Sequence, residues 1–223
     1  KEFFELKHNY PVKFLGHPLV DSISNFKKNY DSSKEQIISN KKPVIAILPG
    51  SRKQEIKKIL NTVIKIVEYF PNHQFIVAGA PNIELSYYNS SLKNKNIKVI
   101  ENKTYELLSI STAAIVTSGT ATLETALFKV PQVVCYKSSY FSYFIAKLIV
   151  KIKYISLVNL IMDQQIVKEL IQQDCNKVNI TNELKKILDL NHRKSLLIKY
   201  DELTSVLGNY GTSKRVALDI IKK

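Results

Sequence analysis

An unbroken apolar run, PVIAIL at Pro43–Leu48, leads directly into a turn that contains Gly50 and then into an amphipathic helix. A run with no polar residue at alternate positions suits a strand that is buried on both faces of a parallel sheet. In the next segment, apolar residues recur at three- and four-residue steps, as expected of a helix with one buried face: Ile56, Ile59, Leu60, Val63, Ile64 and Val67. This unit of strand, turn and helix indicates an α/β fold.

The same unit recurs along the chain. Further elements are predicted as strands at Gln74–Ala78, Ile97–Ile100, Ala113–Val116 and Pro131–Tyr136, and as helices at Glu106–Ile110 and Ala121–Phe128. Short connections between alternating strands and helices imply right-handed crossovers. The sequence therefore predicts a Rossmann-like, doubly wound parallel sheet.

The two ends of the chain show other patterns. The segment Tyr10–Asp21 is expected to begin with a short apolar strand and to break at Gly-His-Pro, where His17 either touches a substrate or caps a turn. Beyond Ser138 the pattern predicts helices alone, up to Lys153 and then at Gln165–Gln173, Asn182–Leu188, Arg193–Leu207 and Ser213–Ile221.

Positive charge dominates the chain. Its 223 residues include 33 Lys and Arg against 19 Asp and Glu, a formal net charge of +14. This balance favours a polyanionic partner, such as nucleic acid, anionic lipid headgroups or phosphorylated substrates. Only three residues are arginines, Arg52, Arg193 and Arg215, whereas proteins that read bases usually depend on arginine forks. We therefore expect no nucleic-acid partner, although a non-catalytic basic module that binds RNA or anionic lipid stays open as an alternative.

Two further features limit the cellular setting. Cys135 and Cys175 stand far apart with no C-x-x-C spacing, so the sequence suggests neither a zinc site nor a disulfide framework, and a reducing cytoplasm fits best. The longest apolar stretch, Tyr140–Ile161, is interrupted by lysines and is not expected to cross a bilayer. Its first part, Tyr140–Ile155, either lies on anionic headgroups or packs on the sheet with its lysines in water.

Two turns combine the features of an anion-binding site at the carboxyl end of a parallel sheet. In the first, LPGSRKQE at Leu48–Glu55, Gly50 permits close backbone approach, Ser51 is expected to cap the helix, and Arg52 can present its guanidinium to a phosphate. The alternative is a capped turn with a solvated arginine.

The second turn lies within TSGTATLETALFKVP at Thr117–Pro131. Thr120 is expected to cap the helix, while the amides and hydroxyls around Ser118 and Gly119 donate to a diphosphate. Glu124 is expected to accept the two hydroxyls of a ribose, and its alternative role is that of an acid favourably placed in a first turn. No Asp-x-Asp metal pair occurs in a suitable turn, so we expect no metal ligands.

Several motifs occur together in one order: GHPLVD at 16–21, LPGSR at 48–52, TSGTATLE at 117–124, the pair Tyr136 and Lys137, SLVNLI at 156–161 and ELIQQD at 169–174. Through these motifs the chain resembles the lipid-A-disaccharide synthase family over nearly its whole length. It departs from the family pattern at Val158 and Lys168, where the family usually has proline.

The resemblance implies a GT-B glycosyltransferase, in which two Rossmann-like halves face a cleft. The family transfers diacylglucosamine from UDP-diacylglucosamine to diacylglucosamine 1-phosphate with inversion, and it releases lipid A disaccharide and UDP. No cofactor is expected, because the UDP-sugar is a substrate. Since both substrates are lipids, the resemblance implies a cytoplasmic enzyme that is peripheral on the inner face of the bacterial inner membrane, with a homodimer as a possibility.

The resemblance also implies roles for individual residues. Gly50, Ser51 and Arg52 would border UDP; Ser118, Gly119, Thr120 and Ala121 would cradle its diphosphate; and Glu124 would hold the ribose. The rest of the cleft would be lined by Lys137, Asn159, Glu169 and Gln172 or Gln173.

The same resemblance predicts how the chain is divided. Residues 1–21 would be a remnant of, or a link to, a missing amino-terminal half; residues 22–191 would form the UDP-sugar-binding domain; and residues 192–223 would return toward the missing half. Because that half would supply the catalytic base, this chain is expected to bind UDP without turnover. The nearest alternative is another UDP-N-acetylglucosamine-dependent GT-B enzyme, either a peptidoglycan glycosyltransferase or a 2-epimerase.

Overall fold

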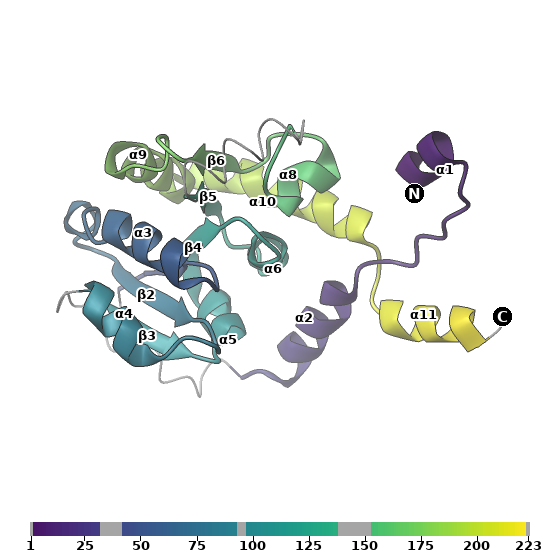
Figure 1. The fold of residues 1–223 in the computed structure, drawn as a ribbon, viewed down its shortest axis with the longest axis horizontal. Helices are drawn as coiled ribbons and strands as arrows, with labels where there is room; N and C mark the ends of the chain where they lie inside the picture. Colours follow the sequence, from purple (N-terminus) through teal and green to yellow (C-terminus); the bar gives the residue numbers. More distant parts are fainter. Residues whose placement is uncertain (1, 32–41, 93–96, 138–152, 222–223) are drawn as a thin grey trace.

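A computed structural model describes residues 2–31, 42–92, 97–137 and 153–221 of the chain. Within these ranges, six parallel strands form one sheet in the order β3-β2-β1-β4-β5-β6 (Figure 1). The strands are β1 Val44–Leu48, β2 Gln74–Gly79, β3 Lys98–Glu101, β4 Ser111–Thr117, β5 Gln132–Tyr136 and β6 Lys168–Ile171. This is the strand order of a Rossmann sheet, so the predicted doubly wound α/β fold is confirmed.

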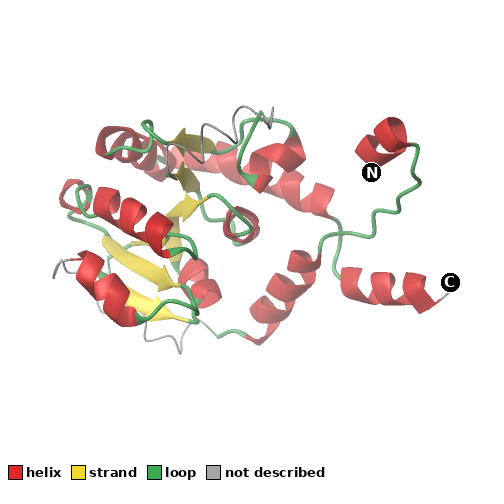
Figure 2. Ribbon diagram, viewed as in Figure 1, coloured by secondary structure: helices red, strands yellow, loops and turns green. Residues whose placement is uncertain are grey.

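Helices cover both faces of the sheet, as Figure 2 shows. Right-handed crossovers place α3 (Lys53–Val63) and α4 (Leu85–Leu92) on one face, where they contact each other. They place α5 (Thr104–Ser109), α6 (Ala121–Leu127) and α8 (Leu157–Met162) on the opposite face. Two carboxyl-terminal helices complete the layers: α9 (Lys177–Leu188) packs on β4 and β5, and α10 (Leu190–Leu207) packs on α6 and α8.

The packing of the core explains why the apolar pattern correctly predicted the strand β1 and the helix α3 that follows it. Every residue of β1 is buried, because the strand is central in the sheet and its two faces lie under helix layers. The apolar face of α3 is buried as well, with Ile56, Ile59, Leu60 and Val63 at most 1% exposed. Burying one such side chain contributes about 1.5–3 kcal/mol, so the strand and the helix stabilise each other.

Two predicted elements are wrong. The stretch Gln165–Gln173 was predicted as a helix, but β6 runs through it and pairs with β5 from Val133↔Lys168 to Tyr136↔Ile171. The free edge of β5 supplies main-chain partners that a local pattern does not reveal. The strand expected after Tyr10 does not form either, since residues 9–17 have no regular structure and lie away from both sheet edges, which are β3 and β6. The sequence pattern had not indicated α1 (Glu2–His8) or α4.

The GHPLVD motif joins the two ends of the described chain, where the segment before α2 (Pro18–Asn29) crosses the connection between α10 and α11 (Thr212–Ile221) in Figure 1. The carboxylate of Asp21 accepts hydrogen bonds from the amides of Gly211, Thr212 and Ser213, at 2.7, 3.2 and 2.8 Å. These bonds lower the pKa of Asp21 to about 2. The motif therefore anchors the carboxyl-terminal helix.

His17 has a structural role in the same motif. Its Nδ1 accepts a hydrogen bond from the amide of Leu19 at 3.2 Å and so caps α2, while its own amide donates to Leu207 O at 2.9 Å. Burial lowers the pKa of His17, which favours the neutral ring that can accept this bond. Of the two roles left open for His17, the structure shows the turn cap.

The described helices include none with the length and apolar character needed to span a bilayer. The segment predicted either to contact headgroups or to pack on the sheet, Tyr140–Ile155, falls mostly at residues 138–152, outside the described ranges.

Candidate functional site

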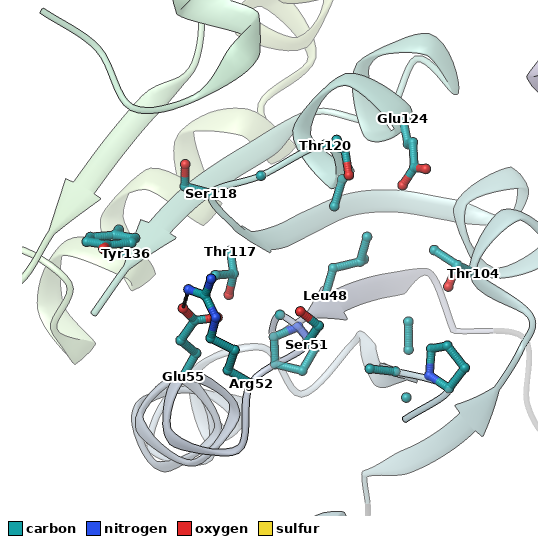
Figure 3. Close-up of a pocket in the computed structure, with 18 residues that line it drawn as sticks. Leu48, Ser51, Arg52, Glu55, Thr104, Thr117, Ser118, Thr120, Glu124 and Tyr136 are labelled. Atoms are coloured by element: carbon teal, nitrogen blue, oxygen red, sulfur yellow. Dashed lines mark hydrogen bonds and ion pairs between the residues drawn. The ribbon is translucent and has the colours of Figure 1, made fainter. Parts of the chain in front are cut away.

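A pocket of about 460 Å³ opens at the carboxyl ends of β1 and β4. These strands are neighbours in the sheet, and the chain leaves them in opposite directions, to β2 on one side and to β5 on the other. Such a switch point is where open α/β sheets bind ligands. The turns after both strands line the pocket together with parts of β2, α5 and β5 (Figure 3): Leu48, Pro49, Gly50, Ser51, Arg52, Glu55, Ala78, Gly79, Ala80, Pro81, Thr104, Thr117, Ser118, Gly119, Thr120, Ala121, Glu124 and Tyr136.

The first turn needs a glycine. Gly50 has φ +98°, and a Cβ added there would lie 3.0 Å from Oε2 of Glu55 and 3.3 Å from Cγ2 of Thr117. The N-cap position of α3 is occupied by Arg52, and no side chain caps the helix, so the predicted cap by Ser51 is wrong. The first-turn amides of α3 consequently have no side-chain cap.

Arg52 presents its charge at the rim of this pocket. Its side chain is 80% exposed, and its Nη1 lies 3.0 Å from Oε1 of Glu55. An exposed pair of this kind is weak, at about 0–1 kcal/mol. An incoming phosphate can therefore compete with Glu55 for the guanidinium at small cost.

The second turn is organised differently from the prediction. The amide of Ser118 donates to Cys135 O at 3.1 Å and its hydroxyl donates to Ile155 O at 2.6 Å, so neither donor is free for a diphosphate. Thr120 occupies the N-cap position of α6 but makes no side-chain cap, which corrects the second predicted cap. Within the described ranges, the amides of Gly119, Thr120 and Ala121 have no acceptor and remain available at the pocket.

Glu124 lies at the other side of the pocket on α6. It is partly buried, which raises its pKa, and a hydrogen bond from the hydroxyl of Tyr105 to Oε1 at 3.3 Å opposes that rise. The pKa of Tyr105 rises to about 12, because its side chain is partly buried and the carboxylate of Glu124 is close. The ring of Tyr105 packs against Phe26 and Phe128, at centroid distances of 5.4 and 5.2 Å. Sequence reasoning missed Tyr105, since nothing in the local pattern links α5 to Glu124.

The remaining residues implied by the resemblance do not line this pocket. Asn159 is fully buried and forms a closed network: its Oδ1 accepts from the amides of Ile166 and Val167, and its Nδ2 donates to Val167 O and to Glu169 Oε1, all at 2.8–2.9 Å. Glu169 also accepts from the amide and the hydroxyl of Ser156 at 2.9 and 2.7 Å. Asn159 and Glu169 thus hold α8 against β6.

The other three residues lie near the end of β6. Lys137 donates from Nζ to Cys175 O at 2.9 Å, where the buried thiols of Cys135 and Cys175 also meet. Gln172 is buried with φ +49°, and its amide donates to Tyr136 O at 2.8 Å. Gln173 is exposed. Their predicted contact with a ligand would need a surface beyond the pocket described above.

The described ranges contain no group of three or more His, Cys, Asp or Glu side chains that could hold a metal ion. The groups that the pocket offers to a ligand are main-chain amides, hydroxyls, one arginine and two carboxylates. This set suits a ligand with phosphoryl oxygens and hydroxyls.

Comparison with solved structures defines the class of this protein. A UDP-N-acetylglucosamine 2-epimerase from Neisseria meningitidis bound to UDP-GlcNAc aligns with a TM-score of 0.59 at 17% identity, covering 98% of this chain and 57% of that chain. WaaG, a glycosyltransferase involved in lipopolysaccharide biosynthesis, aligns with a TM-score of 0.51 at 11% identity, covering 89% and 50%. Together with the strand order, these similarities define the fold class: the chain shares the Rossmann-like fold of both proteins, with its pocket at the switch point of the sheet.

Sequence comparison identifies the family within that class. The family model for lipid-A-disaccharide synthetase matches residues 1–215, and the chain belongs to this family. A lipid-A-disaccharide synthase from Coxiella burnetii (strain Dugway 5J108-111) is 34% identical over 216 residues, which cover 95% of this chain and 57% of the relative. The chain therefore spans a little over half the length of the curated relatives that it matches, and the predicted family is confirmed.

Proposed function

We propose that this chain is the nucleotide-sugar-binding half of a glycosyltransferase that makes lipid A disaccharide. Its pocket between β1 and β4 would hold the UDP of UDP-diacylglucosamine. The observation that carries the proposal is the convergence of the turns at Gly50 and Gly119 on one pocket, in a member of the lipid-A-disaccharide synthase family. The volume of about 460 Å³ suits a ligand of nucleotide size.

The polar groups of the pocket support one orientation of UDP. The unpaired amides of Gly119, Thr120 and Ala121 would donate to the diphosphate, and Arg52 would add a positive charge from the opposite wall. Glu124 would accept the ribose hydroxyls, since its carboxylate faces the pocket and only Tyr105 donates to it in the described ranges. The nucleotide would then extend from Glu124 across both turns.

This arrangement contributes to transfer by stabilising the leaving group. As the bond between the sugar and UDP breaks, negative charge grows on the diphosphate, and fixed amides with Arg52 stabilise that charge more than they stabilise the intact substrate. The acceptor, diacylglucosamine 1-phosphate, and the base that deprotonates it would meet the donor through the part of the relatives' length that this chain does not match. On this proposal the chain binds UDP but does not complete a turnover, and it uses UDP-sugar as a substrate with no separate cofactor.

The location of the reaction follows from its substrates. Both carry acyl chains, so the enzyme would work as a peripheral protein at the cytoplasmic face of the inner membrane. The net charge of +14 suits attraction to an anionic membrane surface.

Calorimetric titration of the chain with UDP tests the proposal. Replacing Glu124 with alanine removes an ionised acceptor of ribose hydroxyls and should weaken UDP binding about 10- to 100-fold with the fold intact. Glu106→Ala is the matched control, because Glu106 lies on α5 outside the pocket. Equal affinity in the Glu124 and Glu106 variants would remove Glu124 from the site. No heat with UDP, together with salt-dependent RNA retention on filters, would favour a basic RNA-binding module.

A further inference from the structure

The hydroxyl of Thr117 is buried without a hydrogen-bond partner. Thr117 is the last residue of β4, is 5% exposed and lines the pocket, and its Oγ1 has no partner anywhere in the described ranges. A buried hydroxyl without a partner has lost its contacts with water and gained nothing in exchange, so folded proteins rarely keep one without a reason. At the wall of a binding pocket, a ligand atom is a sufficient reason.

Neighbouring hydroxyls are already engaged by the fold. Ser118 donates to Ile155 O at 2.6 Å, and Thr122 donates to Gly119 O at 2.8 Å. Among the described residues of this turn region, Thr117 and Thr120 line the pocket with hydroxyls that make no hydrogen bond to the protein, and Thr117 is the buried one of the two.

Glu55 borders the same small space. The point at which a Cβ on Gly50 would stand lies 3.0 Å from Oε2 of Glu55 and 3.3 Å from Cγ2 of Thr117, so both side chains lie beside the backbone of Gly50 at the pocket wall. The other carboxylate oxygen of Glu55, Oε1, pairs with Arg52 at 3.0 Å. The oxygen Oε2 makes no hydrogen bond within the described ranges and faces this space.

We propose that Thr117 and Glu55 bind a hydroxyl of the sugar in the nucleotide-sugar substrate. A sugar hydroxyl both donates and accepts, so it can give its proton to the carboxylate and receive the Thr117 proton. A phosphate can only accept and is repelled by the carboxylate, which makes it the poorer occupant of this space. The inference rests on the proposed function. If Glu124 holds the ribose, the sugar extends to the far side of the pocket, where Figure 3 shows Thr117 and Glu55 beside each other and apart from Glu124.

Thr117→Val tests the proposal, because valine keeps the shape of threonine and removes the hydroxyl. Calorimetry would measure the affinity of each variant for UDP and for UDP-N-acetylglucosamine. We expect Thr117→Val to weaken UDP-N-acetylglucosamine about three- to tenfold and to leave UDP within twofold of the wild type. We also expect no loss of thermal stability, since the removed hydroxyl has no partner in the folded chain.

Thr181→Val is the matched control. Thr181 is also buried with an unpaired Oγ1, but it lies on α9 and does not line the pocket. Its replacement should change neither affinity.

The two ligands separate this inference from the proposed function. If the wild type does not bind UDP, the proposed function fails and the inference falls with it. If the wild type binds UDP but Thr117→Val weakens both ligands equally, Thr117 contacts the diphosphate and the sugar assignment is overturned. Unchanged affinity for both ligands, or a loss of stability that accounts for the weaker binding, overturns it as well.

Discussion

Replacing Asn159 with alanine should destabilise the fold without weakening nucleotide binding at the pocket. The resemblance to the family predicted that Asn159 contacts a ligand, whereas the structure uses all of its side-chain hydrogen bonds within the protein. Its Oδ1 accepts from the amides of Ile166 and Val167 at 2.8 and 2.9 Å, and its Nδ2 donates to Val167 O and Glu169 Oε1 at 2.9 and 2.8 Å. The side chain is fully buried.

The magnitude follows from the groups that lose their partner. Alanine leaves the amides of Ile166 and Val167 facing a cavity, and each unsatisfied buried group costs about 1–3 kcal/mol. Glu169 keeps its bonds from Ser156 and Ile155, and water can enter the space vacated by the amide, so we take the loss as about 2–4 kcal/mol. For a chain of this size, that loss lowers the melting temperature by about 4–16 °C.

Circular dichroism during urea and thermal unfolding would measure this loss, and calorimetry at low temperature would measure UDP-N-acetylglucosamine affinity. Gln173→Ala is the control: Gln173 is exposed, and we expect its replacement to change stability by less than about 0.5 kcal/mol. The reasoning is refuted if Asn159→Ala keeps its stability within about 1 kcal/mol of the wild type while affinity falls tenfold. Such a result would show that Asn159 serves the ligand rather than the fold.

Three further predictions concern charged groups. Because burial raises the pKa of Glu124, UDP affinity should begin to fall at a higher pH than it would with a glutamate of ordinary pKa. Titrations at several pH values should show that Glu124→Gln removes this part of the pH dependence. Glu55→Gln frees Arg52 from its ion pair and should strengthen UDP binding about two- to fivefold at low salt and less at high salt; weaker binding would contradict this role. The pKa of Asp21 is lowered to about 2, so the contribution of Asp21 to stability is present above its unfolded pKa and is lost as the pH falls toward 2. Asp21→Ala should therefore speed hydrogen exchange of the amides at the start of α11 at neutral pH. Unchanged exchange would argue against the cap.

The sequence was most informative where a local pattern carries the physics. The apolar run at Pro43–Leu48 and the helical spacing after it required a buried strand and a helix with one buried face, and the structure has both. A glycine at position 50 was expected to allow close approach, and the structure gives Gly50 a φ of +98°, a conformation that favours glycine. The two turns were expected to share a pocket because parallel strands end at the same edge of a sheet, and both line it.

Local patterns failed where two segments compete for the same partners. The stretch that contains β6 has a sequence compatible with a helix, and it forms a strand because it pairs with the open edge of β5. Both predicted helix caps, at Ser51 and Thr120, were wrong, because residue type alone does not say where a helix begins or which way a side chain turns. The cap that joins Asp21 to α11 spans nearly the whole chain and has no local signal.

By itself the sequence determined the fold class, the family and the two turns that form the pocket, since these depend on the order of apolar and small residues along the chain. Only the tertiary structure decided which polar groups are free to meet a ligand. Ser118 gives its hydroxyl to Ile155, 37 residues away, and Asn159 donates its amide to Val167 just before β6, while Thr117 keeps a buried hydroxyl with no partner in the described ranges. The reason is that a hydrogen-bonding group serves a ligand only if the fold has not already used it, and that depends on contacts between distant segments.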